Sequence, residues 1–244
     1  LFLLAALCVL PVRIPPPSLL RGEASLRAVY EEFVEGVRYA RVNPVVSALT
    51  IICSVMFVGL GLKMGLDVVF AEQVLASASL STSTAYSYMM SASAVGRFLG
   101  SVAVRYLGRR WAKKRVLLLG LGMMSLDALG LAFARSLLFV LGAKLASGIG
   151  WGLGDSLWPT LIQENVEEDK RGRAFSLFLS VVTVLPAITV YLGGWLADHT
   201  SLGLVYGLAG AWALLAVIGS RFLSSYRAIP VHADEGMAVR EGQS

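Results

Sequence analysis

The 244-residue chain carries few charges for its length: 56% of its residues are hydrophobic, 15% are charged, and the formal net charge is +5. A soluble domain needs about a quarter of its residues charged, whereas uncharged runs of roughly 18 or more residues recur here, as they do in transmembrane helices. Composition therefore predicts an integral membrane protein. Basic cytoplasmic loops explain its excess of Lys and Arg better than binding of nucleic acid does.

Two elements precede the first predicted span. Leu1–Leu10 is apolar but too short to cross a membrane, and we interpret it as the end of a truncated transmembrane helix. Residues 11–43 are predicted to form a cytoplasmic linker that starts with the proline-rich stretch PVRIPPPSLLRGEAS. An amphipathic helix is expected next, with apolar residues at helical spacing: Leu26, Tyr30, Phe33 and Val37.

Residues 44–220 are predicted to form a bundle of six transmembrane helices, so the fold class is an all-α membrane protein. Asn43 can cap the first helix, and Pro44 suits its first turn. The six spans are Pro44–Leu62, Ser81–Val104, Val116–Ala134, Leu137–Ile162, Ala174–Ala197 and Ser201–Ser220. A polar cytoplasmic tail, residues 221–244, is predicted to follow.

Basic residues alternate between the gaps that separate these spans. Six cations lie between Arg105 and Arg115, and three more lie between Lys170 and Arg173, whereas the opposite gaps hold few. The positive-inside rule then places both basic clusters and the C-terminus in the cytoplasm. Lys63 and Asp67 are interpreted as markers of an aqueous zone on the other side.

The first basic cluster carries a motif. The sequence SVAVRYLGRR, residues 101–110, resembles the cytoplasmic loop motif G-x-L-A-D-R-x-G-R-R of the major facilitator superfamily. Gly108, Arg109 and Arg110 match the motif, and Ser101 stands for its small leading residue. Arg105 departs from the motif because it takes the place of the acid that, in the family, pairs across the loop to hold one conformation closed.

Three further segments resemble this superfamily in order and spacing. EEFVEGVRYARVNPVV (31–46) is similar to the entry into the seventh helix, WPTLIQENVEEDKRGRAFSLF (158–178) to the loop joining the tenth and eleventh helices, and GGWLADHT (193–200) to the end of the eleventh. The resemblance is to the efflux branch, such as the enterobactin and macrolide exporters. It implies the C-terminal half of a twelve-helix transporter whose N-terminal six-helix half is missing here. It also implies proton-coupled export of small molecules by alternating access across a lipid bilayer, here the bacterial inner membrane.

Charged side chains within spans are candidate functional residues, because each costs roughly 2.5–3.5 kcal/mol on insertion scales. Asp127, near mid-membrane, is predicted either to take up a proton or bind a cationic substrate, or to pair with a neighbouring Lys or Arg. Lys144 and Asp155 lie on the same face of one helix, about 16 Å apart. They fit a polar transport cavity or two separate partners on neighbouring helices, and Lys144 can also snorkel to the membrane surface. Arg97 is expected either to snorkel or to brace the loop motif.

Four glycines, Gly148, Gly150, Gly152 and Gly154, form overlapping small-xxx-small pairs. They predict close helix packing, or smooth surfaces on which helices slide during transport.

No sequence pattern indicates an enzyme, a cofactor or a metal site, since metal-spaced His or Cys residues and a phosphate-binding glycine loop are lacking. Two other functions remain open besides transport of small molecules. The fold is also compatible with a membrane scaffold or sensor that carries nothing, and with movement of lipid between leaflets.

Overall fold

The computed structural model describes residues 26–76 and 80–220, with side chains from residue 34 onward. The predictions for Leu1–Leu10, for the proline-rich stretch and for the tail at 221–244 lie outside the described residues. The chain divides into residues 1–31 and residues 32–244, and all packing described below belongs to the second part.

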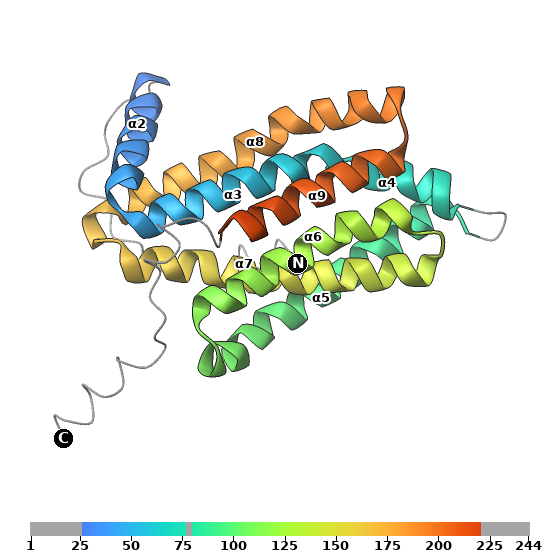
Figure 1. Cartoon of the computed structure of the whole chain (residues 1–244), viewed down its shortest axis with the longest axis horizontal. Coiled ribbons are helices and arrows are strands. Elements are labelled where there is room, and N and C mark those ends of the chain that lie inside the picture. The colour runs from blue at the N-terminus through green and yellow to red at the C-terminus, as the bar shows by residue number, and fades with distance from the viewer. Residues whose placement is uncertain (1–25, 77–79, 221–244) are drawn as a thin grey trace, which may run out of the picture. The chain divides into compact units, whose positions relative to one another are not determined.

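All six predicted spans are helices, which confirms the all-α bundle (Figure 1). The long helices are α3 (Pro44–Lys63), α5 (Thr82–Arg110), α6 (Lys113–Phe133), α7 (Leu137–Asn165), α8 (Arg171–His199) and α9 (Leu202–Ser220). Helix α2 (Leu26–Val42) precedes them. Three short elements lie between them: α4 (Leu66–Phe70), the π-helix η1 (Ala71–Leu75) and the 3-10 turn η2 (Glu168–Lys170).

The predicted cap of the first span is present. The Asn43 side chain accepts hydrogen bonds from the backbone N–H groups of Val45 (3.0 Å) and Val46 (3.1 Å), and Pro44 occupies the first turn. Asn43 Nδ2 also donates to the Asn165 carbonyl at 3.0 Å. The Asn43 side chain thus satisfies two backbone N–H groups at the start of α3 and links this helix to the end of α7.

The predicted boundaries near the basic cluster are wrong. Helix α5 continues to Arg110 instead of ending at Val104, and α6 begins at Lys113, so that Trp111 and Ala112 alone connect them. The motif expected in a loop is therefore helical. Charge marks where a helix leaves the membrane, but long basic side chains are good helix formers and do not end it.

Five segments of the described chain are long and apolar enough to cross a membrane: α3, α6, α7, the stretch Glu168–His199, and α9. Helix α5 is not among them, because it contains many serines and threonines together with Arg97. It packs instead along α7 over much of its length.

The long helices pack in the order α5–α7–α6–α9–α3–α8, each along the next. Figure 1 shows α3, α8 and α9 side by side, with α5, α6 and α7 as a second group. Helix α7 makes little direct contact with α3 or α8. The first and last helices of this order, α5 and α8, therefore belong to different groups.

A break separates α3 from α4. Met64 is extended (ψ 124°), and Gly65 has φ +91°, a left-handed conformation that favours glycine. The break places Lys63 and Asp67 on its two sides.

Candidate functional site

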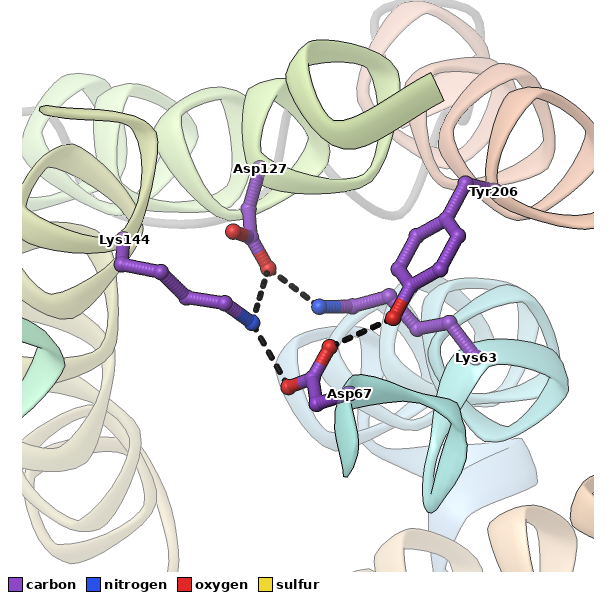
Figure 2. Close-up of polar contacts among 5 residues, drawn as sticks. All are labelled: Lys63, Asp67, Asp127, Lys144 and Tyr206. Atoms are coloured by element: carbon purple, nitrogen blue, oxygen red, sulfur yellow. Dashed lines mark hydrogen bonds and ion pairs between the residues drawn. The ribbon is translucent and has the colours of Figure 1, made fainter. Parts of the chain in front are cut away.

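A network of five polar side chains lies beside this break (Figure 2). Each comes from a different helix: Lys63 ends α3, Asp67 belongs to α4, Asp127 to α6, Lys144 to α7 and Tyr206 to α9. The network therefore ties together five helices, from α3 near the start of the described chain to α9 at its end.

The contacts form a continuous chain of opposite charges. Lys63 donates to Asp127 Oδ2, and Lys144 Nζ lies 3.5 Å from the same oxygen. Lys144 Nζ also donates to Asp67 Oδ2 at 2.6 Å, and the Tyr206 hydroxyl donates to Asp67 Oδ1 at 2.7 Å. Two lysines and two aspartates thus sum to a formal charge of zero.

The network is enclosed. The side chains of Asp127 and Lys144 are 2% and 4% exposed, those of Lys63 and Asp67 12% and 21%. Burial raises the pKa of the Asp67 carboxyl, but the charges of Lys63 and Lys144 and the hydrogen bonds from Lys144 and Tyr206 outweigh it and hold this pKa below its usual value. Asp127 Oδ1 is buried and has no hydrogen-bond partner in the described part of the chain.

Lys63 and Asp67, interpreted from the sequence as markers of an aqueous zone, lie at the last residue of the candidate span α3 and beyond it, and both also take part in this network. Snorkelling of Lys144 is wrong, because its ammonium group is buried between two carboxylates. Asp127 and Lys144, predicted separately as candidates, are brought together by the fold. Tyr206 was not predicted. The signal that further polar residues belong to the site was that Asp127 and Lys144, two opposite charges inside spans, each require a partner.

A pocket of about 910 Å³ adjoins the network. Helix α3, the following break, α4, α5, α7 and α8 line it, and its lining residues include the aromatic Phe57, Tyr86 and Trp151 together with Thr183. Lys63 and Asp67 belong both to this wall and to the network.

The third predicted ionisable residue, Asp155, lies apart from the network and pairs with Arg97. Arg97 Nε and Nη2 lie 2.6 and 2.5 Å from Asp155 Oδ2, which joins α5 to α7. The Arg97 guanidinium also lies 5.4 Å from the Trp151 ring centroid. Asp155 is 39% exposed, so Lys144 and Asp155 have separate partners and different environments.

The four glycines of α7 face different neighbours. A Cβ atom at Gly148 would overlap with the Ser93 carbonyl oxygen, and one at Gly152 with the Arg97 carbonyl oxygen, both on α5. At Gly150 it would lie 2.5 Å from the Gly120 carbonyl oxygen on α6. At Gly154 its nearest neighbour is the Trp158 ring of the same helix, 3.3 Å away. At three of these glycines a Cβ atom would thus collide with the backbone of another helix, whereas at Gly154 it would contact only a side chain of α7 itself.

This arrangement agrees with comparisons to known proteins. Residues 63–239 match the Major Facilitator Superfamily, which is more than half of the chain. The chain belongs to this superfamily. Its members transport solutes, so this chain is a multi-pass membrane protein of a transporter family and not of an enzyme family.

Three relatives are named as transporters. A probable metabolite transport protein of Saccharomyces cerevisiae is 30% identical over 75% of this chain and 34% of its own length. A D-xylose transporter of Levilactobacillus brevis is 30% identical over 56% and 30%, and an arabinose-proton symporter of Escherichia coli is 26% identical over 59% and 30%. The chain thus spans about a third of the length of these relatives.

A solved structure supports the fold. A mutant of the nucleoside transporter NupG superposes with a TM-score of 0.68 at 12% identity, over 91% of this chain and 58% of that one. The expected likeness to exporters in particular is not shown by these relatives, which are named as metabolite and sugar transporters.

The segment that resembles the loop motif of the superfamily, residues 101–110, lies at the end of α5. Ser101 Oγ donates to the Phe98 carbonyl at 2.8 Å, and Arg105, Arg109 and Arg110 are exposed. Arg109 and Arg110 lie in the last turn, where cations interact favourably with the helix dipole. A Cβ atom at Gly108 would meet nothing within 4 Å, so packing within the described chain does not require glycine there.

Proposed function

We propose that this chain forms part of a proton-coupled secondary transporter that moves a small, oxygen-rich solute of the sugar type by alternating access. The observation that carries the proposal is the pocket, which combines rings with polar groups. Its volume, about 910 Å³, is within the range of roughly 300–1,000 Å³ that is common for small-molecule sites. Rings can stack on the apolar face of a sugar while Thr183, Lys63 and Asp67 offer hydrogen bonds.

The names of the relatives favour this class of solute. One is a D-xylose transporter and another an arabinose-proton symporter, which also favours protons as the driving ion and uptake as the direction. Export, expected from the resemblance to the efflux branch, is the alternative direction. We place the protein in the plasma membrane, as a bacterial inner-membrane protein, with the C-terminus in the cytoplasm.

Asp127, Asp155 and Lys144 remain the proposed coupling residues. Asp155 is the first to test, because its carboxylate is exposed and forms an ion pair with Arg97 outside the network of four charges. Asp127 and Lys144 are buried, and a change in the charge of either one disturbs the interactions of all four charged residues of the network.

The test is counterflow of radiolabelled D-xylose and L-arabinose by the full-length protein in proteoliposomes, which needs no gradient and no assumed direction. Trp151→Ala should raise the half-saturating concentration about three- to tenfold, because a stacking ring is lost. Trp195→Ala is the matched control, since Trp195 is exposed on α8 and does not line the pocket. Absence of counterflow for either sugar contradicts the substrate class, and binding without flux favours the scaffold or sensor.

Proton coupling is tested separately with an imposed pH gradient. Asp155→Asn should abolish accumulation against a gradient and leave counterflow intact. If Asp155→Asn and Asp127→Asn both accumulate solute normally, the proposed coupling residues are wrong. If the same gradient drives the solute outward through the wild-type protein, the protein is an exporter.

A further inference from the structure

The wall of the pocket holds two opposite charges. Among the described residues that line it, Lys63 and Asp67 are the only ionised side chains, and the remainder are apolar, aromatic or hydroxyl-bearing. A pocket with a single unpaired charge would attract solutes of the opposite sign, because the interaction is poorly screened in a low-dielectric environment. The balance of charge around these two residues therefore matters for selectivity.

Each of the two has a partner that does not line the pocket. Lys63 is paired with Asp127, and Asp67 with Lys144. Lys144 also contacts Asp127, so the four charges form one unit with a formal sum of zero. Tyr206 adds a neutral hydrogen-bond donor to Asp67.

A second ion pair lies near the pocket. Trp151 lines the pocket, and the Arg97 guanidinium, which is paired with Asp155, lies over its ring. The charges of Arg97 and Asp155 thus also cancel one another.

We propose that Asp127 and Lys144 set the charge selectivity of the pocket without touching the solute. Asp127 neutralises Lys63, and Lys144 neutralises Asp67, so that each charge on the wall has an opposite charge beside it. The wall then offers polar groups without an unpaired charge, and uncharged solutes are accepted while anions and cations are both disfavoured. The inference deepens the proposed function and rests on it for the place where the solute binds.

Removing one of the four charges leaves the network with a net charge, and the pocket should then favour solutes whose charge has the opposite sign to that net charge. Asp127→Asn leaves a net charge of +1 and should favour anions, whereas Lys144→Gln leaves −1 and should favour cations. The double variant Asp127→Asn/Lys144→Gln is neutral again, because Lys63 and Asp67 remain. A merely structural role of these residues would not predict opposite signs or this restoration.

The experiment measures the potential in the pocket of the full-length protein with charged thiol reagents. Val68→Cys, in a cysteine-free background, places the reporter on the pocket wall beside Asp67, where Val68 is exposed. It is modified with cationic trimethylammonium-ethyl and anionic sulfonatoethyl methanethiosulfonate. The ratio of the two rates cancels the intrinsic reactivity of the thiol. Thr200→Cys, exposed at the end of α8 and outside this pocket, is the control.

The proposal expects the rate ratio at Val68→Cys to equal that of free 2-mercaptoethanol within about twofold. It should shift by roughly fivefold or more in opposite directions in the two single variants, as expected for one nearby charge under partial screening. The double variant should return to the wild-type ratio, and the ratio at Thr200→Cys should not change. Equal ratios in all four proteins, shifts of the same sign, or a strongly biased wild type would overturn the proposal.

Two further variants protect the test against misfolding. Asp67→Asn carries the same net charge as Asp127→Asn, and Lys63→Gln the same as Lys144→Gln, so each should shift the rate ratio in the same direction as its counterpart. Because thiol modification requires no transport, loss of sugar counterflow contradicts the proposed function and leaves this measurement unaffected.

Discussion

Replacing Gly148 with alanine should destabilise the protein more than the same change at Gly142. Both glycines lie in α7, but a Cβ atom at Gly142 would meet nothing within 4 Å. At Gly148 it would overlap with the Ser93 carbonyl oxygen and lie 3.0 Å from both Arg97 N and Gly96 Cα. All three neighbours are backbone atoms of α5, so no side-chain rotation can relieve the overlap, and α5 and α7 must move apart.

The magnitude follows from two opposing effects. Alanine is a better helix former than glycine by up to about 1 kcal/mol, and this gain applies equally to both variants. Overpacking of a rigid interface costs about 1–3 kcal/mol, and this cost applies to Gly148→Ala alone. The difference between the two variants therefore isolates the interface, and we expect Gly148→Ala to be less stable than Gly142→Ala by about 1–3 kcal/mol.

The assay is SDS-induced unfolding of the purified full-length protein in mixed micelles, followed by circular dichroism at a fixed lipid ratio. The free energy of unfolding is compared between the two variants and the wild type. Equal stabilities of the two variants, or a loss confined to Gly142→Ala, would refute the assignment of Gly148 to a backbone interface with α5.

Three other predictions use the same unfolding assay. Asn43→Ala should lower the free energy of unfolding by about 1 kcal/mol, because the start of α3 loses its cap; no loss would contradict the capping role. Gly65→Ala should lower the free energy of unfolding by about 1 kcal/mol, because φ is +91° there. Gly219→Ala should not lower it, because a Cβ atom at Gly219 would meet nothing within 4 Å. The pKa of Asp67 is lowered in the folded protein, so the carboxylate stabilises the fold above about pH 4. This stabilisation is lost as the pH falls through the lowered pKa. Asp67→Asn should therefore lose less stability than the wild type between pH 5 and pH 3, and an equal loss would contradict the ion pairing.

The six helices could be predicted from the sequence because lipid imposes a simple rule. A segment that crosses the membrane must be long, apolar and internally hydrogen-bonded, and five of the six segments satisfy this rule, α5 being the more polar exception. The cap at Asn43 was predictable for the same local reason. The ends of α5 and α6 were not, because the rule concerns charge in the membrane and places no limit on how far a helix continues into water.

The network could be predicted only in part, because its contacts depend on helix packing. Lys63 and Asp127 are 64 positions apart, Lys144 and Asp67 are 77 apart, and Tyr206 and Asp67 are 139 apart. Asp127 and Lys144 were conspicuous because they interrupt apolar spans. Lys63 and Asp67 looked like ordinary charges at a helix end, since nothing in the local sequence shows that the break between them lies against α6 and α7.

The position of the pocket follows from how the helices are joined. Helices α5 and α7 meet through backbone at Gly148 and Gly152, and α3 and α8 meet in the same way, since a Cβ atom at Gly193 would overlap with the Leu62 carbonyl oxygen. Such seams leave no volume for a solute, because a single methyl group already collides with the facing helix. Between α4 and α7 the join is instead the ion pair of Lys144 and Asp67, in which a long side chain crosses a gap without filling it. The pocket lies beside this ionic join because that is where the two groups of helices are linked but not packed.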